Sequence, residues 1–293
     1  MAVKEMMRGE IEPVRRSISI GDGAMSLIEW APRGADTVLF VHANGFNAQT
    51  YRTLLSPLSA RLHVIACDLR GHGYTKLPAQ PGLARDWSIF GKDLLALMRA
   101  ISKDPIILAG HSLGATTSFM AAAGRPERVK SLVLIEPVFL APLPPGVRGN
   151  SNSLAESAAQ RRSTFVSHTT AMAYYRKRGI FARWPEAILR DYLNGGLVEN
   201  ADGALRLACT PEWEAEIFRE VPFGIAVLAE KVKCPITILR GTVGTTAIDN
   251  QITAILQARP NSRVITIEAA NHFLPLEQPE HVREEILRAA NLL

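Results

Sequence analysis

A serine between two glycines is the part of this sequence best suited to chemistry. An apolar run, Ile106–Ala109, leads into Gly110-His111-Ser112-Leu113-Gly114, and a helix-compatible stretch follows it. So tight a turn from strand to helix needs small residues two before and two after the serine, and it exposes the hydroxyl on a strained backbone. The pattern at this junction predicts Ser112 as a nucleophile; the alternative is a structural turn serine.

A serine hydroxyl needs a base to take its proton before it can attack. His272 follows the last apolar run, in Asn271-His272-Phe273, on a loop at the carboxyl edge of the predicted sheet. Catalytic groups gather at that edge in open α/β sheets. The other histidines lie in upstream loops, a strand, a helix, the long insertion or directly beside the serine. His272 is therefore the predicted base.

Backbone N–H groups must stabilise the oxygen that becomes negative during such an attack. The helix that follows Ser112 begins at Leu113 and points its first N–H groups toward that place. A second donor is expected from the loop after the third strand, His42-Ala43-Asn44-Gly45-Phe46, with Asn44 as the donor. The alternative for Asn44 is an ordinary Asn-Gly turn.

Short apolar runs alternate with helical patterns along the chain, which predicts a mostly parallel sheet covered by helices. Helices are expected at Trp87–Ser102 and after Pro279. Eight strands are expected: Val14–Ile20, Met25–Trp30, Thr37–Val41, His63–Cys67, Ile106–Ala109, Ser131–Ile135, Ile236–Leu239 and Arg263–Ile267.

One long segment interrupts this alternation. Between Pro137 and Val232 no strand is convincing, and a turn is expected at Asn194-Gly195-Gly196. The sequence therefore predicts a core of residues 1–137 and 233–293, with a helical cap inserted at 138–232. Ten of the chain's 19 Phe, Trp and Tyr residues lie at 138–224, which suits a lid over an apolar pocket. Alternatively, these aromatic side chains only hold the insertion together.

Five side chains are candidates for substrate contact in this arrangement. They come from the loops near the predicted nucleophile and from the insertion: His42, Phe46, His111, Tyr175 and Trp184. Basic residues cluster at Arg161-Arg162 and Arg176-Lys177-Arg178, but 138–224 holds 10 Arg or Lys against 9 Asp or Glu. We interpret the clusters as a solvated face, and expect no nucleic-acid partner despite a formal net charge of +5.

Composition narrows the setting of the protein. No stretch approaches the roughly 20 apolar residues that span a bilayer, and the N-terminus lacks the apolar core of a secretory signal. The three cysteines have no metal-ligand spacing and are odd in number. We therefore expect reduced thiols in a cytoplasmic protein with no bound metal, a small-molecule substrate and no membrane partner; a homodimer is left open.

Four motifs together resemble the α/β-hydrolase family. They are His42-Ala43-Asn44-Gly45-Phe46, Asp68-Leu69-Arg70-Gly71-His72-Gly73, Gly110-His111-Ser112-Leu113-Gly114 and Asn271-His272-Phe273, and they span almost the whole chain. The resemblance implies an eight-stranded, mostly parallel sheet, a lid after strand six, ester-type hydrolysis and no cofactor.

The sequence departs from this family at the acid that should orient the base. The usual Gly-x-x-Asp after strand seven is replaced here by Gly241-Thr242-Val243-Gly244, so Gly244 occupies the acid position. Some members carry the acid after strand six, where this chain has Glu136, and Asp249 is the other candidate. We favour Glu136 because it lies at the end of a strand. Asp249 is alternatively a residue that caps a helix.

The nucleophile limits the reaction class that the resemblance implies. Dehalogenases and epoxide hydrolases of this family use an aspartate, which Ser112 argues against. The sequence predicts an esterase-like serine hydrolase that forms an acyl-enzyme on a neutral, largely apolar substrate. A lactonase, an amidase, a carbon–carbon bond hydrolase and a non-catalytic ligand receptor on the same fold remain alternatives.

Overall fold

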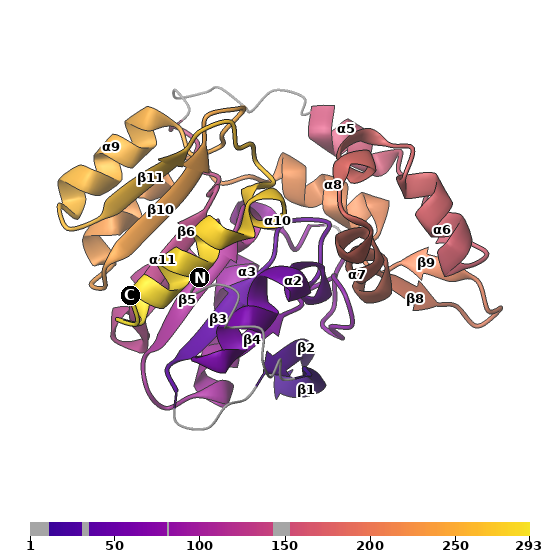
Figure 1. Ribbon diagram of the computed structural model, residues 1–293, viewed down its shortest axis with the longest axis horizontal. Helices are drawn as coiled ribbons and strands as arrows, with labels where there is room; N and C mark the ends of the chain where they lie inside the picture. Colours follow the sequence, from indigo (N-terminus) through magenta and orange to yellow (C-terminus); the bar gives the residue numbers. More distant parts are fainter. Residues whose placement is uncertain (1–11, 31–34, 81, 143–152) are drawn as a thin grey trace, which may run out of the picture.

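A computed structural model describes residues 12–30, 35–80, 82–142 and 153–293 of the 293-residue chain. Its centre is an eight-stranded sheet with strand order β1-β2-β4-β3-β5-β6-β10-β11 (Figure 1). The strands are β1 Val14–Ile20, β2 Gly23–Trp30, β3 Thr37–Val41, β4 His63–Cys67, β5 Ile106–His111, β6 Val129–Ile135, β10 Ile236–Gly241 and β11 Arg263–Ile267. The pairs from β4 to β11 are parallel, whereas β1 and β2 join the sheet antiparallel.

The central strands are apolar throughout because both faces of the sheet are covered. In β3, Leu39 and Val41 enter one core cluster, whereas Val38 and Phe40 enter the other. Successive strand side chains point to opposite faces, so a strand buried on both sides loses the usual polar alternation.

Helices cover both faces of this sheet. The first core cluster receives side chains from α3 (Ser88–Ile101), α4 (Leu113–Gly124) and α9 (Asp249–Ala258). The second receives α2 (Arg52–Leu55), α10 (Leu274–Glu277) and α11 (Pro279–Ala289), and Figure 1 shows α11 crossing the front of the sheet. Short 3₁₀ turns are η1 Ala48–Tyr51, η2 Ser56–Ala60, η3 Arg85–Trp87, η4 Pro126–Arg128, η5 Gly179–Arg183 and η6 Ile225–Lys231.

The predicted sheet is confirmed, with small differences at strand ends. Each of the eight expected strands is present; β2 and β6 begin two residues earlier, and β5 and β10 end two residues later. The two predicted helices are also present, as α3 and α11. Solid apolar runs between turn residues were sufficient to locate these elements.

The segment between β6 and β10, here called the insertion (residues 153–232), forms a lobe on one side of the sheet (Figure 1). Its helices are α5 Ser153–Ala159, α6 His168–Tyr175, α7 Glu186–Gly196 and α8 Pro211–Arg219. The expectation of no strand here was wrong, because β7 (Thr164–Phe165), β9 (Leu205–Leu207) and β8 (Leu197–Glu199) form a small antiparallel sheet. Strands of two or three residues are too short to show a period in sequence.

The turn expected at Asn194-Gly195-Gly196 is instead the last turn of α7. A tertiary contact explains the difference. A Cβ on Gly195 would lie 2.1 Å from the Asn47 side-chain oxygen, and Asn47 Nδ2 donates to the carbonyl of Tyr192 at 2.9 Å. The glycine therefore allows α7 to approach the core rather than ending the helix.

Tryptophan and asparagine side chains fasten the insertion to the core. Trp213 Nε1 on α8 donates to the carbonyl of Arg70 at 3.1 Å, and Trp87 Nε1 on the core donates to the carbonyl of Ile217 at 3.0 Å. Asn44 Nδ2 donates to the carbonyl of Glu214 at 3.0 Å. Helix α8 is thus held against the same loops that carry the predicted oxyanion donor.

Within the described ranges, no helix has the length and apolar character needed to cross a bilayer.

Candidate functional site

The turn at Ser112 has the strain that its glycines predict. Ser112 has φ 55° and ψ −117°, outside the regions that L-residues ordinarily occupy. A Cβ on Gly110 would lie 2.5 Å from the Gly114 carbonyl oxygen, and one on Gly114 would lie 2.1 Å from the Val41 carbonyl oxygen. Both positions therefore require glycine. The Ser112 hydroxyl makes no hydrogen bond to another described residue, so it is left available at the turn.

Sheet register brings the predicted acid beside this turn. The N–H of Ser112 donates to the carbonyl of Ile135 at 2.9 Å, and Glu136 is the first residue after β6. The N–H of Glu136 in turn donates to the carbonyl of Leu239 in β10 at 2.8 Å. Glu136 has a positive φ of 47°, which turns the chain sharply at the strand's carboxyl end. Ser112 and Glu136 therefore leave neighbouring strands at the same edge.

Of the two acid candidates, Glu136 is the one beside His272. Its Oε2 lies 3.4 Å from His272 Nδ1, a long contact between a fully buried carboxylate and a ring whose side chain is 24% exposed. Asp249 is the first residue of α9 and forms an ion pair with Arg240, with 86% of its side chain exposed. The structure does not bring Asp249 to the histidine.

Hydrogen bonds keep the buried Glu136 carboxylate ionised. Burial by itself raises the pKa of Glu136, but contacts with His272 and with the N–H groups of Gly241 and Thr246 outweigh it, so the pKa lies below its usual value. A carboxylate in this state accepts the Nδ1 proton of His272, which leaves Nε2 of the ring free to act as a base.

Neither predicted oxyanion donor, Asn44 or Leu113, uses its backbone N–H in a hydrogen bond to the described residues. In the loop 42–46, the N–H groups of Ala43, Gly45 and Phe46 donate to Tyr51, His72 and Ala43 respectively. The N–H of Asn44 meets no acceptor among the described residues, and neither does the N–H of Leu113, the first residue of α4. Two unpaired donors beside a strained serine suit a developing oxyanion.

Two buried histidines fix this loop. His42 Nδ1 donates to the carbonyl of Ala43 at 2.7 Å, and its Nε2 accepts the N–H of Leu69 at 2.9 Å. His72 Nδ1 donates to the carbonyl of Arg70, and its Nε2 accepts the N–H of Gly45 at 3.1 Å. Because His42 is fully buried and both ring nitrogens are paired, its contact with a substrate would be indirect.

His111 connects the oxyanion loop to the loop of the predicted base. Its Nε2 donates to the carbonyl of His272 at 2.7 Å, and its Nδ1 faces the Tyr51 hydroxyl at 2.7 Å. Tyr51 in turn accepts the N–H of Ala43. His111 is fully buried, so the structure gives this substrate-contact candidate a supporting position behind His272.

These three buried histidines predict a loss of stability in mild acid. Burial lowers the pKa of His42 to about 4 and of His72 to about 3, and lowers that of His111 well below its usual value. In the unfolded chain each titrates near 6.5, so below pH 6.5 the unfolded state binds protons that the folded state does not. The free energy of unfolding therefore falls as pH falls from 6.5 toward 4, by about 1 kcal/mol per histidine per pH unit.

Urea denaturation at pH 7.5 and pH 5.5 measures this loss. We expect a clearly lower midpoint at pH 5.5, and His72→Asn should reduce the difference by about a third. Equal midpoints at the two pH values would contradict neutral burial of the three rings.

An aromatic wall lies between the two predicted catalytic loops and the insertion. The Phe46 ring centroid is 5.6 Å from Trp184, 5.7 Å from Tyr192 and 6.2 Å from Phe273, the neighbour of His272. Trp184 also contacts Phe273, at 6.1 Å. Two of the predicted substrate-contact residues, Phe46 and Trp184, are thus brought together beside the base.

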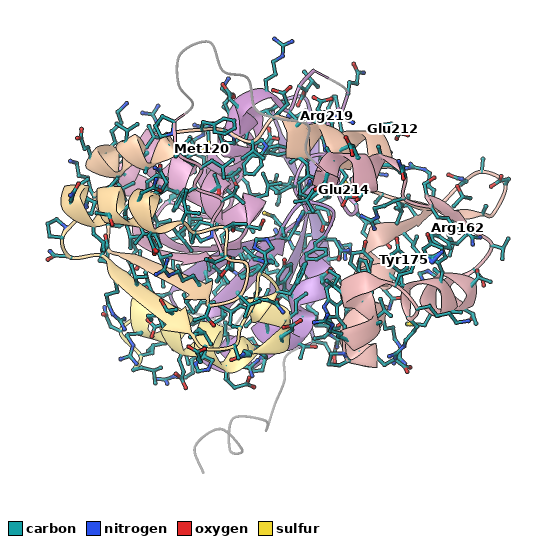
Figure 2. The ribbon with its side chains drawn as sticks, turned by 90° about the horizontal axis from the view of Figure 1, so that it is seen from above. Met120, Arg162, Tyr175, Glu212, Glu214 and Arg219 are labelled. Atoms are coloured by element: carbon teal, nitrogen blue, oxygen red, sulfur yellow. The ribbon has the colours of Figure 1, made fainter. Side chains whose placement is uncertain are left out.

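The fifth substrate-contact candidate, Tyr175, belongs to a cluster of side chains around the charged Arg161, next to this aromatic wall. Arg161 Nη2 donates to the hydroxyls of Tyr175 at 3.0 Å and Tyr192 at 2.5 Å, and Arg161 Nη1 pairs with Glu214. Tyr175 and Glu214 come from α6 and α8 (Figure 2). Burial lowers the pKa of Arg161, but Tyr192, Glu214 and Tyr175 raise it well above its usual value, so it stays charged.

This group lies beside the oxyanion loop. A Cβ on Gly45 would come 2.4 Å from a carboxylate oxygen of Glu214 and 3.3 Å from Arg161 Nη1. The interpretation of Arg161 as part of a solvated face was therefore wrong, because its side chain is only 19% exposed. Its neighbour Arg162 fits the expectation, since it is exposed and stacks over Phe165 and Tyr174.

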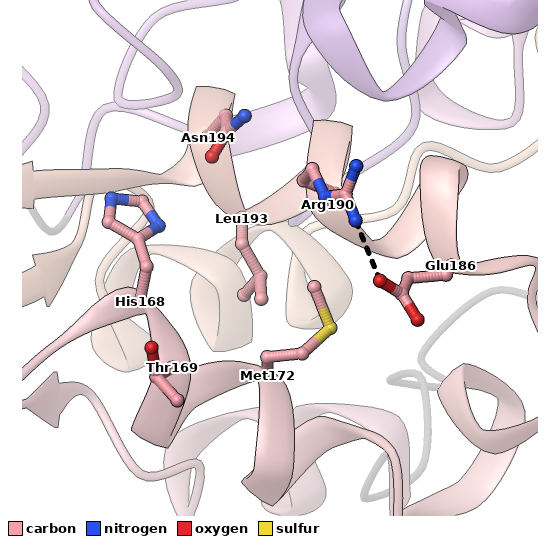
Figure 3. Close-up of a pocket in the computed structure, with 7 residues that line it drawn as sticks. All are labelled: His168, Thr169, Met172, Glu186, Arg190, Leu193 and Asn194. Carbon is pink, nitrogen blue, oxygen red and sulfur yellow. Dashed lines mark hydrogen bonds and ion pairs between the residues drawn. The ribbon is translucent and has the colours of Figure 1, made fainter.

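A separate surface pocket of about 340 Å³ lies on the insertion (Figure 3). Its lining comes from α6 and α7, and Figure 3 shows Arg190 paired with Glu186, one turn away on α7. It is lined by His168, Thr169, Met172, Glu186, Arg190, Leu193 and Asn194, none of them a predicted site residue. In the part of the chain that the structure describes, no group of three or more His, Cys, Asp or Glu side chains is arranged to hold a metal ion.

Sequence reasoning missed side chains that contact the predicted acid and His111. Thr245 and Thr246 contact the Glu136 carboxylate, and Tyr51 contacts His111. Two adjacent threonines in the loop where the family usually carries its acid were the available signal for the first. Nothing near Tyr51 in sequence marks its contact with a residue 60 positions away.

Comparison with known proteins agrees with the fold of the chain. A family described as the alpha/beta hydrolase family matches residues 38–285. The chain belongs to the α/β-hydrolase family. Its eight-stranded sheet, with helices on both faces, is the fold that its motifs implied, and the chain is a hydrolase of that fold.

Relatives within this α/β-hydrolase family differ in their substrates. The chain is 26% identical over 267 residues, 91% of each chain, to 2-(acetamidomethylene)succinate hydrolase of Mesorhizobium japonicum. The crystal structure of E-2-(acetamidomethylene)succinate hydrolase covers 96% of this chain and all of its own, with TM-score 0.78 and 24% identity. Monoglyceride lipase of Rattus norvegicus is 34% identical over 119 residues, 38% of this chain and 39% of its own.

Proposed function

We propose that the protein is a serine hydrolase that cleaves an acyl bond through an acyl-enzyme. The observation that carries this proposal is the edge of the sheet where strained Ser112, His272 and the buried carboxylate of Glu136 lie beside two unpaired N–H groups. A ligand receptor has no need of a strained serine, an ionised buried acid and unpaired donors at one place.

The proposed reaction follows from these groups. His272 takes the Ser112 proton as the hydroxyl oxygen attacks the carbonyl carbon of the substrate, while Glu136 stabilises the charged imidazolium. The N–H groups of Leu113 and Asn44 donate to the oxygen that becomes negative. His272 then protonates the leaving group, the acyl-enzyme forms, and water attacks it by the same steps to release the acid and the free serine.

The insertion is proposed as a cap that forms the acyl pocket. Phe46, Trp184 and Phe273 together offer an apolar surface beside His272, drawn from the oxyanion loop, the insertion and the base loop. Such a wall favours a neutral, largely apolar group on the substrate. Core residues 1–137 and 233–293 would then supply the chemistry, and residues 138–232 the specificity.

Two observations favour a second candidate, a substrate that carries a carboxylate. Arg161 keeps a buried positive charge beside the oxyanion loop, although Glu214 offsets much of it. The buried indole N–H of Trp184 has no acceptor in the described part of the chain. The Mesorhizobium relative is named as a hydrolase of a succinate, which agrees with this candidate.

A series of p-nitrophenyl esters tests the proposed function and its apolar pocket. From acetate to octanoate we expect kcat/KM to rise about fourfold per methylene until the pocket is full, because each buried methylene contributes about 0.8 kcal/mol. If neither these neutral esters nor the mono-p-nitrophenyl ester of succinate is hydrolysed, the result would contradict an acyl hydrolase. A flat profile would show that the aromatic wall does not contact the acyl chain.

The mono-p-nitrophenyl ester of succinate separates the two candidates. An apolar pocket predicts that the butyrate ester is the better substrate, whereas recognition by Arg161 predicts a succinate preference of at least about tenfold. That preference should disappear in Arg161→Gln and persist in Arg162→Gln, the matched change at the exposed neighbour. A preference unchanged by Arg161→Gln would exclude this guanidinium as the anion site.

A further inference from the structure

The loop after β10 surrounds the carboxylate of Glu136. Oε1 accepts the N–H of Gly241 at 2.6 Å. Oε2 accepts the Thr245 hydroxyl at 3.0 Å and the N–H of Thr246 at 3.0 Å. In this loop Gly244 occupies the position at which the family motif carries its acid. The loop instead donates to Glu136, the first residue after the neighbouring strand β6.

The Thr246 hydroxyl lies between the acid and the base. Its oxygen is 3.0 Å from the carbonyl of Glu136, 3.2 Å from the carbonyl of Pro137 and 3.3 Å from His272 Nδ1. The hydroxyl also lies 3.5 Å from Glu136 Oε2, so its one proton is directed at these two carbonyls and at the carboxylate. It fills the space that the long contact between Glu136 and His272 leaves beside the ring.

A fully buried carboxylate depends on such donors. Without them, burial favours the protonated acid, which has no negative charge to stabilise an imidazolium. His272 is the titratable side chain that contacts Glu136 in the described chain. Arg240 on β10 pairs with Asp249, and Glu268 faces Thr242, so neither charge contributes to holding Glu136.

We propose that Thr245 and Thr246 are positioning residues whose hydroxyls hold the Glu136 carboxylate ionised and directed at His272. The inference rests on the proposed Ser112–His272 chemistry and extends it to the loop after β10. Two hydroxyls and two N–H groups of this loop donate to the acid at the end of β6 and stabilise its charged form. A purely structural role is the competing explanation, since Thr246 also ties this loop to the carbonyls of Glu136 and Pro137.

The pH dependence of the double variant Thr245→Val/Thr246→Val separates the two explanations. Loss of the hydroxyls should let Glu136 take a proton at higher pH, so kcat should fall about tenfold at pH 8 and roughly a hundredfold at pH 5.5 relative to wild type, with little change in KM. Thr245→Ser/Thr246→Ser, which keeps both hydroxyls, should stay within about threefold at both pH values.

Thr242→Val is the control within the same loop, because its hydroxyl contacts Glu268 and the N–H of Ala269 rather than Glu136. We expect it to follow the wild-type pH profile. A double valine variant that loses the same factor at pH 5.5 and pH 8 would overturn the inference, because a structural defect lowers activity evenly. Wild-type protein without esterase activity would instead count against the proposed function.

The ionisation of Glu136 is also measurable without turnover. The difference in unfolding free energy between a protein and its Glu136→Gln variant, followed against pH, reports the pH at which Glu136 loses its charge. We expect that pH to be higher in the double valine background than in wild type. An unchanged midpoint would overturn the inference whether or not the protein hydrolyses esters.

Discussion

Replacing Ser112 by alanine is expected to lower kcat toward p-nitrophenyl esters by about 10⁴- to 10⁶-fold, because only this hydroxyl can form the proposed acyl-enzyme. His272 and the two N–H donors remain in the variant, so a small residual rate above the uncatalysed one should persist. A phosphonate probe should add a single adduct, on Ser112 of the wild-type protein.

Ser118→Ala is the matched control for this change. Ser118 lies six positions further along, in α4, and its buried hydroxyl donates to the carbonyl of Gly114. Removing it should change kcat by no more than about threefold, since a side chain that bonds back to its own helix contributes little. Full activity in Ser112→Ala, or an adduct on another residue, would refute the assignment of the nucleophile.

The sequence was sufficient to predict the core because the core obeys local rules. Each central strand is a solid apolar run between turn residues, and Gly110 and Gly114 mark a turn that tolerates no side chain. The order of these motifs along the chain predicted which loops share the carboxyl edge of the sheet. That edge is where Ser112, Glu136 and His272 lie in the structure.

Local sequence rules of this kind do not predict contacts between segments that are distant in the chain. The sequence predicts Gly195 as a turn residue, but it lies in a helix because Asn47 of the core fills the space beside it. The sequence predicts Arg161 as an exposed charge, but its guanidinium donates to two tyrosine hydroxyls and pairs with Glu214. In both cases the partner is more than 10 positions away, and only the folded chain identifies it.

The same limit applies to the acid. Glu136 and Asp249 both follow strands that end at the functional edge, and the spacing in sequence did not exclude either one. Packing distinguishes them. Glu136 is fully buried among donors, whereas Asp249 is exposed and paired with Arg240 at the start of a helix. An exposed ion pair of this kind contributes little to stability or to the orientation of a distant ring.

Glu136→Gln is therefore expected to reduce kcat by about 10⁴-fold, while Asp249→Asn changes it less than about twofold. The glutamine keeps the size of the side chain but has no charge to stabilise the imidazolium, and its NH₂ group can hold His272 in the wrong tautomer. Both variants should unfold cooperatively, and steady-state kinetics on one ester at pH 8 are sufficient to compare them.

The pair of variants separates the two acids because the changes are chemically identical. A large loss in Asp249→Asn with near wild-type rates in Glu136→Gln would assign the catalytic acid to Asp249, after β10. The contacts of Thr245 and Thr246 with Glu136 would then have no part in catalysis. Equal losses in both would indicate that the loop moves when substrate binds, since Asp249 is directed at Arg240 in this structure. The expected result, a loss confined to Glu136, identifies the end of β6 as the source of the charge that orients His272.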